Sequence, residues 1–256
     1  MKVRTGIVVP TLGTRPNYLI ECLRSIRAAG DTYICVVAPS SKKLANDLEQ
    51  CLWDAIIEDP KIGLAGAVNT GIEALPEFIE FCNWLGDDDL LKPGTVSDLE
   101  HVLDNSDDAV LVYGNCLYID GSGLQIWRSA FGAFAARIIR FGPCLIPQPG
   151  SLFRRKQFLF LGGLNPNLGW AFDFDLFIRM SKIGKLVHVD VDVSAFRWHS
   201  DSLTVSERRK SVAEAGVVRN ANYSPLIKKV ARIWEPVLRL TTFYGPKLFK
   251  KNNCSH

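Results

Sequence analysis

Three consecutive aspartates, Asp87 to Asp89, follow an apolar run that stops at Gly86. Carboxylates placed this close repel one another, and their oxygens are the hard ligands that Mg²⁺ and Mn²⁺ prefer in proteins. A divalent cation shared with the phosphates of a substrate would offset the repulsion. The alternative is structural, because aspartate is also common in turns and directly before helices. Taken by themselves, the three residues favour neither interpretation.

A second pair of carboxylates, Asp173 and Asp175, lies in the segment FDFDLFIRM, which we expect to be helical. A carboxylate in a cleft can take a proton from a hydroxyl group and so act as a general base. The two residues are two positions apart, so on a helix they point in different directions and only one is expected to face a cleft. Both could equally be first-turn carboxylates that the helix dipole stabilises.

The elements that must position these residues begin with an alternation of strand-like and helix-like segments in the first third of the chain. The strand runs are continuously apolar, as in parallel sheets that are covered on both faces. The pattern predicts an α/β fold with a doubly wound, mostly parallel sheet and helices that continue to the C-terminus. Ligands of such sheets bind beyond the carboxyl ends of the strands, where the loops 10–17, 58–63 and 86–89 fall. The expected strands are 3–10, 32–39, 54–59 and 78–86, and the expected helices are 17–30, 41–52 and 64–75.

The rest of the chain changes pattern after Gly94. We expect a helix over 95–103 and a strand over 109–119, followed by a basic, apolar segment over 126–151. We interpret that segment as an amphipathic helix on the body of the protein, with a mobile flap as the alternative. A strand edge, a loop and a helix that ends at Gly184 are expected after it, and then a further strand.

The composition is that of a globular protein. The chain has 256 residues, of which 47% are apolar and 22% charged, enough to bury a large core. No run approaches the roughly 20 apolar residues that span a bilayer, and the apolar stretch at the start is too short for a signal peptide. Seven scattered cysteines without a C-x-x-C pair favour reduced thiols. We therefore expect a cytoplasmic protein, with the inner face of the cell membrane as a further location.

The net charge of +3 is unevenly distributed along the chain. Seven bases and one acid fall between Ser224 and Lys251, which leaves the body slightly acidic. A nucleic-acid-binding protein would carry its basic surface on the folded domain, so we expect no nucleic acid partner. Apolar residues from Leu226 to Leu238 recur at helical spacing. This amphipathic helix is expected to lie on an anionic membrane, to pack on the body or to join a second subunit.

Several segments of the chain together resemble family 2 glycosyltransferases. The resemblance runs from Gly6 to Thr204, and the order of several motifs makes it more specific than any one of them. It implies the GT-A fold of nucleotide-diphospho-sugar transferases. It also implies transfer of a sugar from a nucleoside-diphosphate sugar donor, with inversion at the anomeric carbon and with Mn²⁺ or Mg²⁺ as cofactor. The segments are IVVPTLGTRPNYLIECLRSI, GLAGAVNTGI, WLGDDDLLKPG, GSLFRRKQFLFLGGLN, FDFDLFIRM and WHSDSLT.

The resemblance also implies which residues bind the donor. The segment GDDD lies where the family has its D-x-D-D signature, with Gly86 in place of the first aspartate. That first position usually helps to hold the ribose, a role that falls here to Asp87 or to the backbone. The donor-binding residues implied in this way are Pro10, Thr11, Arg15, Asp59, Gly63, Asn69, Asp87 and Asp88.

The metal and the catalytic base follow from the same resemblance. Asp89 is expected to be the main metal ligand, with Asp88 and His199 as the others. The aspartate that acts as base in similar enzymes corresponds to Asp173, and Phe172 stands where those enzymes have glutamate.

His199 has two interpretations, as a ligand or as a structural group. A lone histidine is more often a hydrogen-bonded core or surface group than a ligand. The resemblance favours the ligand role, since a histidine at this position in similar enzymes meets the metal or the diphosphate. Arg197 and Trp198, the two residues before it, are expected to pack beside it and to neutralise charge.

These expectations divide the chain into a GT-A catalytic domain over 1–205 and a helical, basic tail over 206–256. The nucleotide and metal half would cover about 1–120 and the acceptor half about 121–205. The expected acceptor is a glycan or a lipid-linked molecule, in surface polysaccharide synthesis. One alternative is a sugar-phosphate nucleotidyltransferase, which would need a glycine-rich, basic phosphate loop after the first strand. The other is a non-catalytic sugar-nucleotide-binding subunit, which would lack the base or the metal residues.

We expect the full-length protein to co-sediment with anionic but not with neutral vesicles, because the basic side of the C-terminal helix would meet anionic headgroups. The binding should weaken as salt is added, and truncation after Ala221 should abolish it. Absence of vesicle binding, or a truncated protein that unfolds, would instead place the helix in the core or at a subunit interface.

Overall fold

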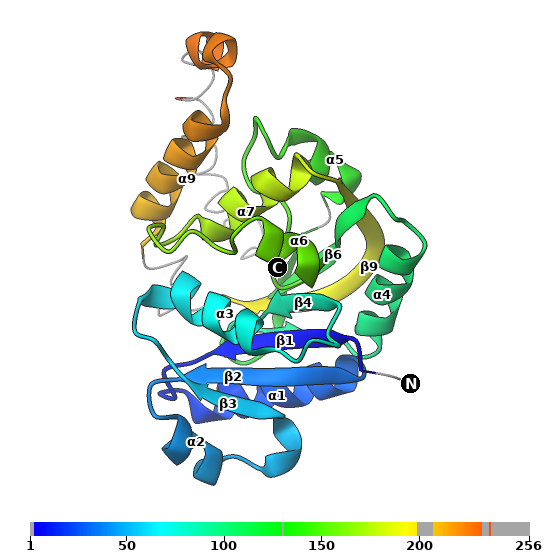
Figure 1. The fold of residues 1–256 in the computed structure, drawn as a ribbon, viewed down its shortest axis with the longest axis vertical. Helices are drawn as coiled ribbons and strands as arrows, with labels where there is room; N and C mark the ends of the chain where they lie inside the picture. The colour runs from blue at the N-terminus through cyan, green and yellow to red at the C-terminus, as the bar shows by residue number, and fades with distance from the viewer. Residues whose placement is uncertain (1–2, 130, 199–206, 232–235, 237–256) are drawn as a thin grey trace, which may run out of the picture.

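The computed structural model describes residues 3–129, 131–198, 207–231 and 236 (Figure 1). In chain order its elements are β1 (Thr5–Pro10), α1 (Pro16–Ala29), β2 (Thr32–Ala38), α2 (Ser41–Asp47), a 3₁₀ turn (Gln50–Leu52), β3 (Ala55–Glu58), α3 (Gly63–Ala74), β4 (Phe81–Trp84), β5 (Leu90–Leu91), α4 (Thr95–Asp104), β6 (Ala109–Ile119), β7 (Gln125–Ser129), α5 (Gly132–Ile138), β8 (Ser151–Arg154), α6 (Arg155–Phe160), α7 (Phe172–Ser181), β9 (Lys185–Arg197) and α9 (Arg208–Asn222).

One sheet of nine strands organises the described part of the chain, in the order β3-β2-β1-β4-β8-β6-β9-β5, with β7 paired to β6. The first four strands in the chain run parallel, and β6 is parallel to β9. Each antiparallel pairing involves β5, β7 or β8. The expected fold class, an α/β protein with a doubly wound, mostly parallel sheet, is therefore confirmed.

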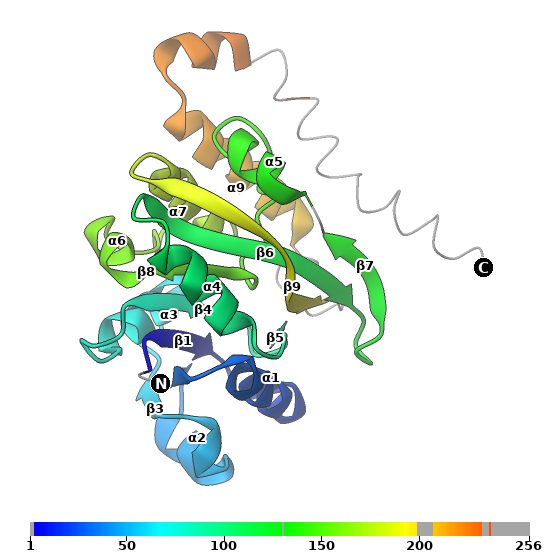
Figure 2. The same cartoon turned by 90° about the vertical axis from the view of Figure 1, so that its right-hand side faces the viewer.

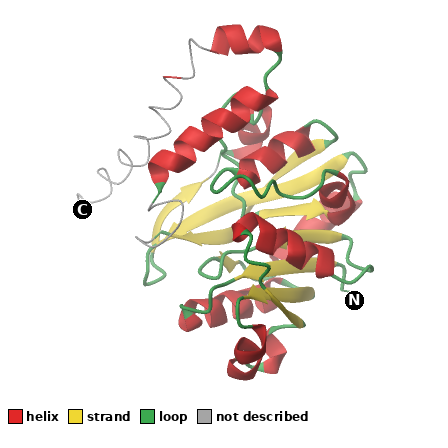
Figure 3. Cartoon of the chain, turned by 60° about the vertical axis from the view of Figure 1, so that its left-hand side comes forward, coloured by secondary structure: helices red, strands yellow, loops and turns green. Residues whose placement is uncertain are grey.

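Helices cover both faces of the sheet (Figure 3). Along β1, Ile7 and Val9 join the core under α1, whereas Val8 between them joins the core under α3. Each of these side chains is at most 2% exposed. Successive strand residues point to opposite faces, so a strand buried on both sides needs an apolar residue at every position. This is the physical reason for the uninterrupted apolar runs in the sequence.

Two expected helices are different in the structure. The expected helix over 41–52 stops early, because Leu48 has extended backbone and a separate 3₁₀ turn follows. The expected helix within 126–151 is restricted to α5, and the residues before it form the edge strand β7. In β7, the Trp127 ring lies 4.8 Å from the Tyr118 ring on β6, and Arg128 Nε donates to Asp192 Oδ1 at 2.7 Å. These cross-strand contacts favour the strand over the helical pattern.

The helix α9 packs against α7, as Figure 1 shows in orange and yellow-green. Val218 of α9 joins the main core, and the Arg219 guanidinium lies 5.8 Å from the centre of the Phe174 ring. Directly after the helix, the Tyr223 ring stacks on Phe141 at 6.3 Å. The vesicle experiment is therefore better made with a truncation after Ser224, which keeps the Tyr223 contact.

The predicted amphipathic helix of the tail is described only in part. Residues 225–231 are helical, and apart from residue 236 the rest of it lies outside the described residues. Within the ranges that the structure describes, no helix is long and apolar enough to cross a membrane.

The strand β9 brings the second half of the chain to the loop over residues 86–89 that follows β4, which we call the acidic loop. It has 13 residues and lies between β6 and β5, and near its end Ala195 is opposite Leu90 of β5 (Figure 2). The end of β9 thus lies directly beside the residue that follows Asp89. Residues more than a hundred positions apart in the sequence meet at this point.

Candidate active site

The acidic loop is held from the loop after β1. Thr11 Oγ1 donates to Asp87 Oδ2 at 2.5 Å. Arg15 donates through Nη2 to Asp87 Oδ1 at 2.6 Å and through Nη1 to Asp88 Oδ2 at 2.7 Å. Both loops follow the carboxyl ends of neighbouring parallel strands, which is why they meet. The structure therefore brings together four of the residues that the sequence singled out.

Burial and nearby charges act in opposite directions on Asp87. Burial raises the pKa of its carboxyl group, whereas the hydrogen bond from Thr11 and the positive charge of Arg15 lower it. Only 7% of the Asp87 side chain is exposed, against 32% for Arg15. Part of the repulsion within the acidic loop is thus offset by a cation from the chain itself.

Asp89 is buried on the opposite side of the loop, at the end of β9. Its Oδ1 accepts a hydrogen bond of 3.0 Å from the backbone N–H of Arg197. Burial, and then the charge of Asp88, raise the pKa of Asp89 well above its usual value. A group in this state favours a neighbouring cation, because a cation would stabilise its ionised form.

The Arg197 side chain holds the acidic loop in place through the loop backbone. It is 2% exposed, and it donates to the backbone carbonyl of Asp88 at 3.0 Å and to that of Gly121 at 3.3 Å. It also pairs with Glu21 at 2.7 Å and lies 4.4 Å from the centre of the Tyr18 ring. The expected packing of Arg197 beside His199 stays a prediction, because His199 lies outside the described residues. The Arg197 partners Glu21 and Tyr18 were missed, because nothing in the spacing along α1 indicates them.

Gly86 explains how the acidic loop can fold back on itself. A Cβ atom at this position would lie 2.9 Å from Asp88 Oδ1 and 3.0 Å from Asp89 Oδ2. The two oxygens therefore converge on space that only a glycine leaves open. An aspartate side chain at this position would push the carboxylates of Asp88 and Asp89 apart.

The carboxylate oxygens of Asp88 and Asp89 are the type of ligand that a hard divalent cation takes. Such ions commonly take only one or two protein carboxylates and complete their shell with water and substrate phosphates. Within the described part of the chain, no group of three His, Cys, Asp or Glu side chains is arranged to hold a metal. The third expected ligand, His199, lies outside the described residues.

Asp173 lies in the first turn of α7 and is partly buried. Burial raises its pKa to about 6, with a further contribution from the charge of Glu214, while a hydrogen bond of 2.7 Å from the Phe174 N–H acts in the opposite direction. Asp175 behaves differently, because it forms an ion pair of 2.8 Å with Arg179 on its own helix. The two carboxylates thus have different surroundings, and Asp173 has the properties that suit a base near neutral pH.

Phe172 ties the start of α7 to the strand that carries the acidic loop. Its ring lies 6.3 Å from that of Trp84, the last residue of β4. Gln148 reinforces this region, because its Nε2 donates to the Trp84 carbonyl at 2.7 Å.

The two acidic regions influence a shared group of titratable side chains. Burial and then the charge of Asp173 raise the pKa of Cys144. Burial is also the main cause of the raised pKa of Tyr118, to which both Asp89 and Cys144 contribute. Asp173 thus contributes to the raised pKa of Cys144, and Asp89 to that of Tyr118.

Three predicted donor-binding residues, Asp59, Gly63 and Asn69, follow β3 and differ in their surroundings. Asp59 is partly exposed, and its Oδ1 accepts the Lys61 N–H at 2.8 Å. Gly63 begins α3 with φ of 85°, a left-handed conformation that favours glycine. Asn69 joins α3 to a distant loop, since its amide group exchanges two 2.8 Å hydrogen bonds with the Leu164 backbone. Asn69 therefore has a structural contact, and its predicted role at the donor stays a prediction, as do those of Asp59 and Gly63.

A pocket of about 440 Å³ lies between the start of α3 and the loop that leads into α7. The wall of the pocket formed by α3 includes Gly63, a predicted donor-binding residue. The opposite wall includes Trp170, three residues before Asp173. Its lining residues are Gly63, Leu64, Ala65, Pro166, Asn167, Leu168, Gly169, Trp170 and Glu214.

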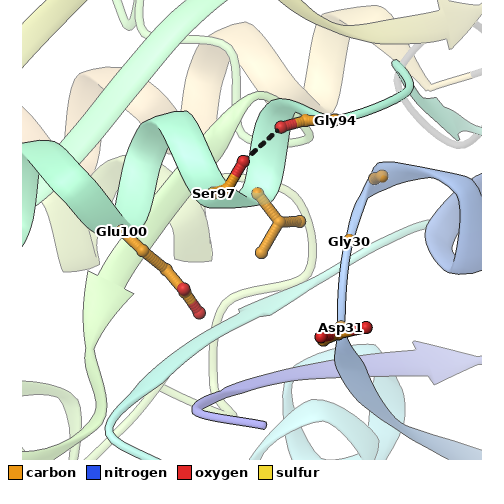
Figure 4. Close-up of a pocket in the computed structure, with 7 residues that line it drawn as sticks. Gly30, Asp31, Gly94, Ser97 and Glu100 are labelled. Atoms are coloured by element: carbon orange, nitrogen blue, oxygen red, sulfur yellow. Dashed lines mark hydrogen bonds between the residues drawn. The ribbon is translucent and has the colours of Figure 1, made fainter. Parts of the chain in front are cut away.

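A smaller pocket of about 220 Å³ lies at the opposite edge of the sheet, between the end of α1 and the start of α4 (Figure 4). Gly30 and Asp31 border it just before β2 begins, and Glu100 faces it from α4. The Ser97 hydroxyl beside it donates to the Gly94 carbonyl at 2.8 Å. This pocket is at the amino ends of the strands, away from the acidic loop, and we do not assign it to the active site.

The fold matches solved structures of glycosyltransferases. TarS 1–349 from S. aureus in complex with UDP-GlcNAc superposes with a TM-score of 0.66 at 13% identity, over 95% of this chain and 73% of that one. The mannosyltransferase PcManGT from Pyrobaculum calidifontis, in complex with GDP-Man and Mn²⁺, superposes with a TM-score of 0.66 at 16% identity, over 97% of this chain and 74% of that one. No family model matches the sequence, and no curated protein sequence matches it. At these identities, the likeness establishes the fold.

We expect Arg15→Met to lower the free energy of unfolding by about 1–3 kcal/mol near neutral pH, because Asp87 would lose a charged hydrogen-bond partner in a buried place. The loss should shrink as the pH falls through the pKa of Asp87, since a protonated carboxyl no longer attracts the cation. Denaturant unfolding at neutral and at acidic pH measures both effects.

Arg24→Met on the same helix is the matched control, since its ion pair with Glu49 is 61% and 62% exposed. Its effect should stay within about 0.5 kcal/mol at both pH values. Equal effects of the two substitutions would mean that Arg15 does not compensate the acidic loop.

Proposed function

We propose that the protein is a glycosyltransferase that moves a sugar from a nucleoside-diphosphate sugar to a hydroxyl group of an acceptor, with inversion at the anomeric carbon. The observation that carries this proposal is the convergence of Asp88 and Asp89 over Gly86, at the carboxyl edge of parallel strands. Asp173, a carboxyl group with a pKa of about 6, directly follows Phe172, whose ring lies 6.3 Å from that of Trp84 at the end of β4. The likeness to transferases crystallised with UDP-GlcNAc and GDP-Man supports this choice of donor class.

In this proposal the loop after β1 binds the nucleoside. Pro10 and Thr11 lie at the end of the strand, and Thr11 and Arg15 already orient the Asp87 carboxylate. Asp87 thereby becomes a fixed acceptor for the ribose hydroxyl groups. Arg15, which is 32% exposed, can also approach a phosphate oxygen, because a guanidinium binds carboxylate and phosphate in the same fork geometry.

The transfer step assigns the proton to Asp173. The oxygen of an acceptor hydroxyl forms a bond to the anomeric carbon while the bond from that carbon to the diphosphate oxygen breaks. The hydroxyl proton passes to the Asp173 carboxylate, and the nucleoside diphosphate leaves with the bonding electron pair. A base with a pKa of about 6 is ionised at neutral pH and still accepts a proton in the transition state.

Asp88 and Asp89 are the residues that would hold Mn²⁺ or Mg²⁺, with His199 as a further proposed ligand. A bound divalent cation at this place would neutralise charge that develops on the departing diphosphate. The Mn²⁺ complex of the similar mannosyltransferase supports this proposal. Arg197 contributes by fixing the backbone of Asp88 and by donating its N–H to Asp89, so the carboxylates keep their place.

The acceptor is proposed to be a glycan or a lipid-linked molecule, in surface polysaccharide synthesis. The basic tail after Ser224 would then keep the enzyme near an anionic membrane surface in the cytoplasm. We also propose that α9 belongs to the catalytic unit, because it supplies Val218 to the core.

The donor and metal sites are tested by thermal unfolding with Mn²⁺ and a panel of nucleoside diphosphates. We expect the preferred diphosphate at about 100 times its Kd to raise the Tm of the wild type by several degrees. Asp88→Ala combined with Asp89→Ala should abolish this increase and the hydrolysis of the corresponding nucleotide sugar. The variant should remain folded, because two repelling carboxylates are removed.

The matched control is Asp47→Ala combined with Asp107→Ala, two exposed aspartates outside the site. It should keep the increase in Tm and the hydrolysis. Full activity of the Asp88/Asp89 variant would exclude the proposed metal site.

The base is tested by Asp173→Asn, which keeps the shape and the hydrogen bond to Phe174 but cannot accept a proton. We expect turnover to fall on the order of 10²-fold or more with donor affinity retained. Wild-type turnover should decline as the pH drops through about 6, where Asp173 becomes protonated. Asp175→Asn is the control, and it should lose stability through its broken pair with Arg179 without moving this pH midpoint.

The same substitution has an expected effect on stability. The pKa of Asp173 is higher in the folded protein than in the unfolded chain, so ionised Asp173 destabilises the fold above about pH 6. Asp173→Asn should therefore be more stable than the wild type at neutral pH, and the difference should vanish as the pH falls to about 4. A variant that binds the donor less tightly but turns over normally would show that Asp173 is not the base.

A further inference from the structure

Glu214 of α9 binds three consecutive backbone N–H groups in the loop before α7. Its Oε1 accepts from Gly169 at 2.9 Å, and its Oε2 accepts from both Trp170 and Ala171 at 2.6 Å. Successive N–H groups that point to one side form a concave site for an anion, and negative charge is also favoured at the start of a helix. The carboxylate therefore fixes the last residues of the chain before Phe172 and Asp173.

The helix that carries Glu214 is itself anchored on both sides of this contact. One turn before Glu214, the Lys210 ammonium lies 5.4 Å from the centre of the Trp170 ring. One turn after it, Val218 and Arg219 are buried against the core and the Phe174 ring. A carboxylate on a rigid support holds a loop more accurately than one on a mobile segment.

The loop that Glu214 holds also forms one wall of the pocket of about 440 Å³. Gly169 and Trp170 belong to that wall together with Glu214, and the start of α3 forms the opposite wall. A shift of the loop would therefore change the shape of the pocket and the place of Asp173 at the same time.

We propose that Glu214 is a positioning residue that holds residues 169–171, so that Asp173 keeps the place and the partly dehydrated surroundings of a general base. This inference rests on the proposed function of Asp173. Among the described residues, the charge of Glu214 of α9 acts on Asp173, and Cys144 from the segment before β8 is in turn affected by the charges of Asp173 and of Arg219 on α9. On α7 itself, Asp175 is paired with Arg179. The charge of Glu214 adds to the effect of burial in raising the pKa of Asp173.

The experiment uses the full-length protein with Glu214→Gln, Glu214→Ala and the control Glu207→Gln. Glu207 lies just before the same helix and pairs with Lys210 at 3.0 Å. Hydrolysis of UDP- and GDP-sugars with Mn²⁺ is measured as kcat and KM across the acidic and neutral pH range. We expect kcat of Glu214→Ala to fall on the order of 10-fold with the donor KM unchanged, because the base is misplaced.

The pH profile separates positioning from simple support of the fold. In both Glu214 variants the acidic midpoint of kcat should move below the wild-type value of about 6. Loss of the nearby negative charge and entry of water both favour the ionised form of Asp173, so the two effects have the same sign. Glu207→Gln should keep the wild-type midpoint. A fall in stability with an unchanged midpoint would overturn the proposal.

Two measurements do not depend on turnover. Hydrogen exchange at the amides of residues 169–171 should be slow in the wild type and in Glu207→Gln, and faster in Glu214→Ala. The pKa of the Asp173 carboxyl group, followed by carbon NMR, should be lower in Glu214→Gln, which keeps the size of the side chain if Glu214→Ala fails to fold. Unchanged exchange together with an unchanged pKa would overturn the role of Glu214. If the wild type hydrolyses none of the donors while both changes occur, the proposed function fails and the control of Asp173 by Glu214 stands.

Discussion

The structure depends on the charge balance of one short loop, in which three carboxylates follow a buried strand. Burial raises the pKa values of Asp87 and Asp89, so their ionised forms need partners. Arg15 supplies positive charge from one side, and Arg197 supplies backbone and side-chain hydrogen bonds from the other. The chain can therefore keep an acidic loop folded while two oxygens, from Asp88 and Asp89, remain directed at the space above Gly86.

This balance explains why distant segments must meet. Arg15 comes from the start of α1 and Arg197 from the end of β9. Both reach the loop because β1 and β4 are parallel neighbours and because β5, which directly follows the loop, pairs with β9. The long β9 makes this possible, since it pairs with β6 on one edge and with β5 on the other. The parallel strands β1 and β4 thus fix the position of the loop, and the antiparallel pairing of β5 with β9 brings Arg197 to its other side.

A similar arrangement recurs at the start of α7, with the charges reversed in role. There the carboxylate of Glu214 is the support, and three backbone N–H groups are held by it. Because a partly buried Asp173 follows immediately, the support of the loop and the protonation of the proposed base are physically linked. In the acidic loop, arginine side chains stabilise carboxylates that would bind a ligand. At the start of α7, the Glu214 carboxylate stabilises the backbone that leads to Asp173.

The sequence by itself determined the α/β fold and the position of the acidic loop at the carboxyl edge of the sheet, because apolar runs and loop order depend on local spacing. The resemblance pointed to Thr11, Arg15 and Asp87, which the structure brings into contact, while their roles at the donor stay predictions. The sequence did not determine β7, where cross-strand contacts outweigh the local helical pattern, or the early end of α2, where Leu48 takes an extended backbone. The tertiary structure alone decided the partners of Arg197, the contact of Asn69 with Leu164 and the role of Glu214. These contacts join residues between 43 and 176 positions apart, and their free energy depends on distance in space, which residue spacing along the chain does not encode.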